Sequence, residues 1–254
     1  TATTEIYTLF PTRRSSDLTM VEIMWLGQAC FYIRCNGTSI VLDPYFQQEK
    51  CPNPIPECVY NADWLLVSHA HHDHIDDAFP LMRRNPNMRT NLSVEIGEYF
   101  CCNGFSDRVR KMNKGAFVPM SGGFKVAFVH AEHSSGMRTE DGSYVGGEAN
   151  SFILVTPDNH TIYFTGDTAL HGDMQLINDF YKPDICLLCM GGDFAMGPVE
   201  AAYAVDRFFT NAKTVVPMHW GTQGCPGTPD QMKAAMKRTD VNFLEVIPGK
   251  MYEL

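Results

Sequence analysis

Long apolar runs are missing from this sequence of 254 residues. No segment approaches the roughly 18 apolar residues that a transmembrane helix needs. A charged segment followed by a short apolar one, the pattern of a secretory signal, does not open the chain either. The nine cysteines are an odd number in a chain too long to depend on disulfide bonds. We therefore expect a protein of the reducing cytoplasm with no part in a membrane.

Positive charge is scarce as well. The chain has 20 Lys and Arg residues against 29 Asp and Glu residues, a formal net charge of -9, and no basic run interrupts this balance. A field of this sign disfavours polyanions, so nucleic acid is not the expected partner. The sequence also lacks a Gly-x-Ser-x-Gly elbow, which argues against chemistry by a serine triad.

The first 18 residues, TATTEIYTLFPTRRSSDL, show neither helical nor strand periodicity, whereas an orderly strand pattern begins just after Met20. This segment resembles the translation of a sequencing-library adapter with one frame slip near Leu9. A natural disordered tail is the alternative. We expect residues 1–19 to be an artefactual or disordered N-terminal segment and residues 20–254 to form one folded domain.

Short β-rich segments alternate with turns through the rest of the chain, and 44% apolar content is enough to bury a core. We expect strands at residues 21–26, 30–34, 39–42, 64–67, 124–130, 151–156, 161–164, 185–190, 214–218 and 242–246. We expect helices at residues 76–84, 170–181, 199–209 and 229–238. A strand-dense first half followed by interleaved strands and helices indicates two packed sheets flanked by helices.

Two local patterns refine this prediction. Asn36-Gly37 between two expected strands predicts a hairpin turn. Cys186 and Cys189 form a C-x-x-C inside the apolar run 185–190. We expect these cysteines to pack in the core, because free cysteine is among the most buried residue types.

The densest group of metal-ligating side chains follows the expected strand 64–67. The segment SHAHHDH, residues 68–74, contains the pattern H-x-H-x-D-H on a loop that leaves a strand. Imidazole nitrogens and carboxylate oxygens suit Zn²⁺, Mn²⁺ or Fe²⁺. Such groups are costly at the mouth of a buried strand unless a cation binds them. The pattern therefore predicts a metal site, with a surface cluster of polar residues as the alternative.

Three later residues each follow an expected strand: His133, Asp167 and His219. Singly each is weak evidence, because a lone histidine after a strand more often hydrogen-bonds within the scaffold. Taken together in this order after H-x-H-x-D-H, they are highly specific and supply enough donors for two coordination spheres.

With these metal-ligating residues in this order along the sequence, the chain resembles the metallo-β-lactamase superfamily from Met20 to its last residue. It looks closest to the branch of bacterial and archaeal metal-dependent hydrolases related to L-ascorbate-6-phosphate lactonase. The segments that carry the resemblance are WLGQACFYI, VLDPY, LLVSHAHHDH, AEHSS, GGEANSFIL, TIYFTGDTAL, MGGDFAMGPVEAA and VVPMHWGT. The resemblance implies an α+β fold, a four-layer αββα sandwich, with metals between the loops at one edge. Residues 20–254 would then be a metallo-β-lactamase-like hydrolase domain.

The resemblance also implies two divalent metal ions per chain, zinc or manganese. His69, His71 and His133 would hold one ion, Asp73, His74 and His219 the other, and Asp167 would bridge both. Two such ions about 3.5–4 Å apart would share a water and lower its pKa. Asp73 is the expected catalytic residue, because it would both ligate a metal and orient the attacking hydroxide.

The expected function is therefore hydrolysis of a small ester, lactone, amide or phosphodiester by a metal-bridged hydroxide. A nuclease resembling the tRNA-processing members of the superfamily is one alternative. A metal-binding scaffold or sensor without turnover is another, because fold alone does not establish catalysis. The expected partner is a small-molecule substrate, and a homo-oligomer is left open.

Neighbouring polar residues have expected supporting roles. Asp43 resembles the family's first acidic motif, which supports the metal loop through hydrogen bonds. Asp193 would do the same or touch substrate, and ordinary turn aspartates are the alternative for both residues.

Four further histidines have less definite roles. His130 could compete for the ligand role of the histidine three residues later, and His171 could face the cleft or cap the start of a helix. We expect His72 to point away from the metals and His160 to be solvated.

Overall fold

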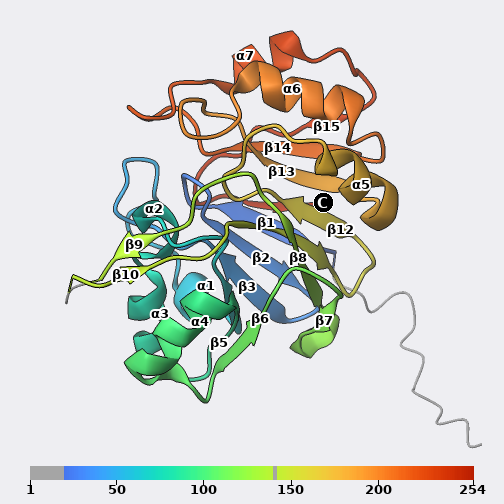
Figure 1. Ribbon diagram of the computed structural model, residues 1–254. Helices are drawn as coiled ribbons and strands as arrows, with labels where there is room; N and C mark the ends of the chain where they lie inside the picture. Colours follow the sequence, from blue (N-terminus) through green and yellow to red (C-terminus); the bar gives the residue numbers. More distant parts are fainter. Residues whose placement is uncertain (1–19, 140–141) are drawn as a thin grey trace, which may run out of the picture.

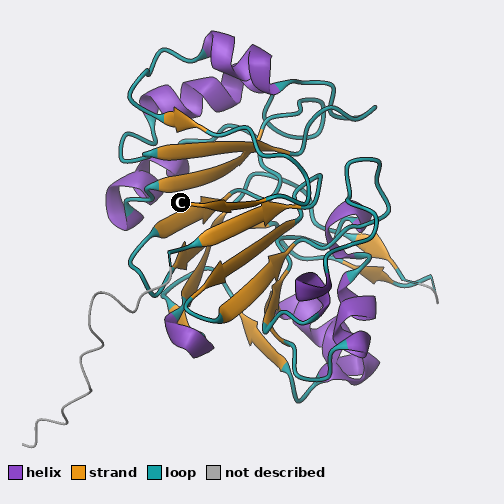
Figure 2. Cartoon of the chain, turned by 180° about the vertical axis from the view of Figure 1, so that it is seen from behind, coloured by secondary structure: helices purple, strands orange, loops and turns teal. Residues whose placement is uncertain are grey.

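The computed structural model describes residues 20–139 and 142–254. The expected N-terminal segment, residues 1–19, lies outside the described residues. Two mixed sheets pack against each other with helices on both outer faces (Figures 1 and 2). This is the α+β, four-layer αββα sandwich that the sequence predicts.

The first sheet runs in the order β16-β1-β2-β3-β4-β5-β6. Its strands are β16 (Met251–Glu253), β1 (Glu22–Trp25), β2 (Phe31–Cys35), β3 (Thr38–Leu42), β4 (Trp64–Leu66), β5 (Arg89–Ser93) and β6 (Val109–Met112). Strands β16 to β3 are antiparallel, and β3 to β6 are parallel. The outer face of this sheet packs on α1 (Glu57–Tyr60), α2 (His72–Ile75), α3 (Ala78–Arg84) and α4 (Val94–Phe100).

The second sheet runs in the order β15-β14-β13-β12-β11-β8-β7. Its strands are β15 (Asn242–Phe243), β14 (Thr214–Met218), β13 (Ile185–Cys189), β12 (Thr161–Phe164), β11 (Asn150–Val155), β8 (Lys125–His130) and β7 (Val118–Pro119). Its outer face packs on α5 (Asp173–Tyr181), α6 (Pro198–Arg207) and α7 (Pro229–Ala235). A small hairpin of β9 (Met137–Arg138) and β10 (Tyr144–Val145) lies apart from both sheets.

The core between the sheets follows from alternation along the strands. In β1, Ile23 and Trp25 face the second sheet, while Met24 faces the helices. Across the interface Phe31 meets Phe164 edge to face, with 6.5 Å between the ring centroids. Two apolar faces are thereby removed from water together, which is the main force holding a sandwich together.

The two local patterns in the sequence are confirmed. Asn36 and Gly37 join β2 to β3 with positive φ angles of 50° and 75°, which a two-residue hairpin turn requires. Cys186 and Cys189 lie in β13, a parallel strand with both faces covered, and both are buried and free of disulfide bonds.

Some elements differ from the prediction. The expected helix 76–84 is α3, which begins two residues later at Ala78, and the short helix α2 before it was not predicted. The expected strand 242–246 is reduced to β15. Strands β5, β6 and β16 and helix α4 were not predicted. In β5 the fully buried positions Thr90 and Asn91 are polar, so the strand carries no apolar alternation. Within the described part of the chain, no helix is long and apolar enough to cross a membrane.

Candidate metal centre

The H-x-H-x-D-H segment does not form the simple loop that the sequence suggests. His71, five residues after the end of β4, has an extended backbone, and helix α2 begins at the next residue, His72. His69 and His71 therefore lie before the helix, whereas Asp73 and His74 lie on its first turn. This change of direction lets one short segment present donors at two neighbouring points.

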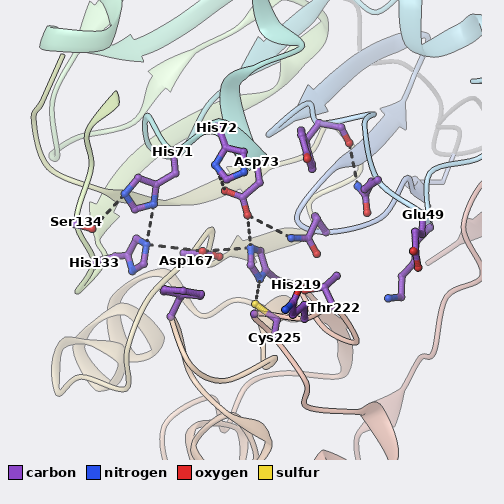
Figure 3. A pocket seen from close by; sticks show the side chains of 17 residues that line it. Glu49, His71, His72, Asp73, His133, Ser134, Asp167, His219, Thr222 and Cys225 are labelled. Carbon is purple, nitrogen blue, oxygen red and sulfur yellow. Dashed lines mark hydrogen bonds and ion pairs between the residues drawn. The ribbon is translucent and has the colours of Figure 1, made fainter. Parts of the chain in front are cut away.

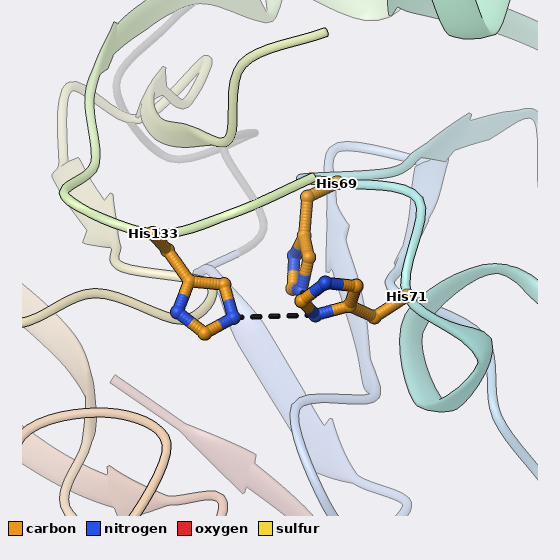
Figure 4. Close-up of side chains that lie close together, drawn as sticks. All are labelled: His69, His71 and His133. Carbon is orange, nitrogen blue, oxygen red and sulfur yellow. Dashed lines mark hydrogen bonds between the residues drawn. The ribbon is translucent and has the colours of Figure 1, made fainter. Parts of the chain in front are cut away.

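The first group of donors consists of His69, His71 and His133 (Figure 4). The Nε2 atom of His69 lies 3.0 Å from Nδ1 of His71, and Nε2 of His133 lies 3.2 Å from the same Nδ1 atom. Burial lowers the pKa of each of the three imidazoles. Neutral rings with converging lone pairs are the form of histidine that ligates metals.

The second group consists of Asp73, His74 and His219, whose donor atoms all lie within 4.8 Å of one another. Asp73 Oδ2 lies 3.2 Å from His219 Nε2 and 3.8 Å from His74 Nε2. Burial would raise the pKa of Asp73, but the imidazoles of His219 and His74 outweigh it and hold that pKa well below its usual range. Asp73 is therefore an ionised acceptor at neutral pH.

Asp167 lies between the two groups. Its Oδ2 atom is 3.3 Å from His219 Nε2, 3.4 Å from His74 Nε2 and 3.8 Å from His133 Nε2. The close approach depends on Gly166, which has a φ of +55° and whose added Cβ would lie 2.7 Å from the Ser68 side chain. The His219 and His74 rings overcome the effect of burial and lower the pKa of Asp167.

The residues present fit divalent cations. Two buried atoms at this centre, His74 Nε2 and Asp167 Oδ1, have no hydrogen-bond partner among the described residues. Unpaired buried groups cost about 1–3 kcal/mol each, and a cation between them would satisfy both. Burial disfavours a charged His74, yet Asp167 and Asp43 raise its pKa to about 10. Carboxylates that favour a proton on the His74 ring would equally favour a metal cation bound to Nε2 instead of that proton.

Asp43 supports the centre from behind. It follows β3, is fully buried, and accepts hydrogen bonds from the Ser68 amide at 2.7 Å and the Ser68 hydroxyl at 2.5 Å. Its Oδ2 atom also lies 2.7 Å from Nδ1 of His74. The pair fixes the ring so that Nε2 faces Asp167, the arrangement in which a carboxylate orients a metal-binding histidine.

Two residues that the sequence did not single out also position donors. Gln28 donates from Nε2 to Asp73 Oδ2 at 3.3 Å, and its carbonyl accepts from the amide of His219 at 3.0 Å. The Cys225 thiol lies 3.2 Å from Nδ1 of His219. Gln28 lies in WLGQACFYI, one of the segments that carry the resemblance, but only the folded chain shows that Gln28 and Cys225 reach the site.

A cavity of about 550 Å³ opens over the donors (Figure 3). Figure 3 shows His71, Asp73, His133, Asp167 and His219 facing it. Further residues that line the cavity are Gln28, Tyr45, Gln48, Glu49, Lys50, His72, Ser134, Phe194, Thr222, Gln223, Gly224 and Cys225. Concave sites of this size typically accept small molecules.

Lys50 supplies a cation at the edge of the cavity. Its ammonium donates to the carbonyl of Gly221 at 2.7 Å and lies 5.0 Å from the centroid of the Trp220 ring. Burial lowers the pKa of Lys50. His72, as expected, does not join the donors: it is exposed and packs edge-on against Tyr45 at 5.8 Å.

The structure places three further polar residues outside the cavity. Asp193 is exposed in a left-handed turn with a φ of 52° and does not line the cavity, although its neighbour Phe194 does. His171 neither lines the cavity nor caps α5, whose N-cap is Gly172 without a side-chain hydrogen bond. His160 is not simply solvated, because its Nδ1 atom lies 2.8 Å from Asp184 Oδ2.

A four-layer αββα sandwich with histidine and aspartate clusters at one edge defines a metallo-β-lactamase fold. The model of the β-lactamase superfamily domain matches residues 22–219, and the chain belongs to this superfamily. It is similar to the UPF0173 metal-dependent hydrolase of Anaeromyxobacter dehalogenans, at 37% identity over 239 residues, or 90% of this chain and 85% of the relative. A second UPF0173 metal-dependent hydrolase, from Methanopyrus kandleri, is 33% identical over 236 residues, covering 92% of this chain and 100% of the relative.

Among solved structures, the chain is similar to Igni18, a metallo hydrolase from Ignicoccus hospitalis. The TM-score is 0.80 and the identity 26%, with 93% of this chain and 100% of the other covered. The chain is thus a metal-dependent hydrolase of the metallo-β-lactamase superfamily. The relation to L-ascorbate-6-phosphate lactonase stays a prediction.

Proposed function

We propose that this hydrolase cleaves a small ester, lactone, amide or phosphodiester with two divalent cations bound at the candidate centre. One observation carries the proposal. Five imidazoles and two carboxylates converge below an open cavity, and His74 Nε2 and Asp167 Oδ1 are buried there without hydrogen-bond partners among the described residues. A structural cluster would pair its own donors, whereas a cation site leaves them for the ion.

In this proposal His69, His71 and His133 hold one cation, Asp73, His74 and His219 hold the other, and Asp167 binds both. The donor atoms within each group of three lie no more than 4.8 Å apart. Asp167 Oδ2 lies within 3.8 Å of histidines from both groups. Nitrogen and oxygen donors of this kind suit zinc or manganese.

The chain's own residues then position substrate and proton. Two bound divalent cations supply a water of lowered pKa and polarise the scissile bond. Asp73 is the proposed catalytic residue, because its carboxylate faces the cavity and its Oδ2 atom is held by Gln28 and His219. The ionised carboxylate can accept the proton of the attacking water.

The walls of the cavity suggest the kind of substrate. Phe194 and Tyr45 offer apolar and aromatic surface, while the Lys50 ammonium can attract a negatively charged group. A net charge of -9 over the chain works against long polyanions. These features favour a small molecule over a nucleic acid.

Metal analysis followed by a substrate panel tests the proposal. We expect about two zinc or manganese ions at the centre per folded chain, fewer in Asp167→Asn, and loss of hydrolysis after chelation that is restored by metal. Asp193→Asn is the matched control, because Asp193 is exposed outside the cavity. Metal content unchanged in Asp167→Asn would remove the bridging role. A metal-loaded protein that turned over no ester, lactone, amide or phosphodiester would favour a binding scaffold.

A further inference from the structure

A second group of histidines and carboxylates lies outside the cavity. His130 ends β8, His171 precedes α5, and Asp173 lies in the first turn of α5. One donor atom from each of the three lies within 4.8 Å of the others. The two imidazole rings meet edge to face with 4.7 Å between their centroids. The Oε2 atom of Glu132 lies 3.3 Å from Nε2 of His130, but Glu132 is not part of the group of three.

His171 has no role that the folded chain explains. Both of its ring nitrogens are enclosed and lack a hydrogen-bond partner among the described residues. An imidazole always carries at least one N–H group, so the ring leaves a donor unsatisfied at a real cost in free energy. Burial, followed by the neighbouring His130, lowers the pKa of His171. The ring is therefore neutral at neutral pH and offers a lone pair.

We propose that His130, His171 and Asp173 form a separate site that binds one zinc ion. Two imidazoles and a carboxylate are a donor set typical of zinc, with a fourth position left for water. The three donor atoms already lie within 4.8 Å of one another. A zinc ion on His171 also removes the unsatisfied nitrogen.

The position of the site indicates a structural role. The Glu132 amide donates to Thr168 Oγ1 at 2.9 Å, and the Ala169 amide donates to the Glu132 carbonyl at 3.0 Å. These hydrogen bonds join the loop that carries His133 to the loop that carries Asp167. A zinc ion bound by His130 and His171 would add a third link between these two loops, beside the two hydrogen bonds and outside the cavity.

The test is zinc content and zinc-dependent stability of the full chain. Protein equilibrated with micromolar Zn²⁺ is analysed for zinc per folded chain and for its thermal unfolding midpoint. We expect His171→Asn to hold about one zinc ion fewer than the parent chain and to lose part of the stabilisation by zinc. His160→Asn is the matched control, since His160 pairs with Asp184 and belongs to neither cluster. It should keep the full zinc content.

Two further variants keep the test decisive. Asp173 is exposed, so Asp173→Asn should fold even if His171→Asn does not, and it should bind the additional zinc more weakly. Asp167→Asn, which disturbs the centre under the cavity, should still retain the ion that His171→Asn loses. The zinc difference between the parent chain and His171→Asn therefore stands even if the two-cation assignment of the centre fails. Equal zinc content in the parent chain, His171→Asn and Asp173→Asn, or a difference seen only at millimolar zinc, would overturn the proposal.

Discussion

His74 and Asp43 form a fully buried pair in which Nδ1 of the ring lies 2.7 Å from the carboxylate oxygen Oδ2. Ser68 donates to the same carboxylate from its amide and its hydroxyl, so Asp43 cannot turn away from the ring. The pair determines which nitrogen of His74 faces Asp167. Metal affinity should therefore depend on a residue that does not reach the cavity.

The first prediction follows from this pair. Asp43→Asn should weaken metal binding at the centre by about 10–100-fold, because the amide no longer holds His74 in one orientation and tautomer. Affinity is measured by competition with a coloured chelator. Asp184→Asn is the matched control, because it removes the carboxylate from the His160 pair, which involves none of the proposed ligands. Similar metal affinity in both variants would show that Asp43 does not orient a ligand.

The second prediction concerns the proposed catalytic carboxylate. Asp73→Asn keeps the size of the side chain but removes the charge that accepts a proton and binds a cation. Turnover of any substrate found by the panel should fall about a hundredfold or more, with the fold intact by circular dichroism.

Asp76→Asn makes the same chemical change three residues later, at an exposed position that ends α2. It should keep activity close to that of the parent chain. Full activity in Asp73→Asn would place the chemistry elsewhere in the molecule.

The third prediction uses the approach of the Asp167 loop to Ser68. Gly166→Ala combines a positive φ with a Cβ that would lie 2.7 Å from the Ser68 side chain. The free energy of unfolding in urea should fall by about 1–3 kcal/mol, and metal content should fall with it. In Gly37→Ala the φ is also positive, but the added Cβ meets nothing within 4 Å. In this control variant the free energy of unfolding should fall only by the cost of a positive φ in alanine, about 1 kcal/mol. Metal binding should be unchanged.

The fourth prediction concerns the N-terminal segment, residues 1–19, whose sequence shows no strand or helical period. A chain that starts at Met20 should unfold at the same temperature and bind the same amount of metal as the full chain. A large loss of thermal stability after this truncation would show that the segment contributes to the fold.

Periodicity and ligand chemistry carried most of the prediction. Strands such as β1 and β13 were found because their side chains follow the pleat or fill a buried core. His133, Asp167 and His219 were singled out because each follows a strand, and the structure brings them to one edge. Strand β5 could not be found in this way, because parallel pairing, rather than apolar side chains, determines its place.

Contacts between distant segments are what the sequence hides. Nothing in the residues around Cys225 indicates that its thiol meets His219. Likewise, Gln28 and Asp73 are 45 residues apart in the sequence and meet only in the folded chain. His160 and Asp184 pair across two parallel strands, β12 and β13, so their partnership depends on strand register. Such relationships require the packed molecule, because local propensity carries no information about them.

The donors of the candidate centre come from both sheets: the H-x-H-x-D-H segment follows a strand of the first, and His133, Asp167 and His219 follow strands of the second. A partly unfolded chain in which the sheets have separated would offer neither complete group. Cations bound at this edge would therefore hold the two sheets together. They would stabilise the folded molecule by mass action, because they bind the folded chain and not the separated sheets. In a cell short of the metal, we would then expect two effects. The enzyme would stop turning over substrate, and the less stable protein would unfold and be degraded by proteases.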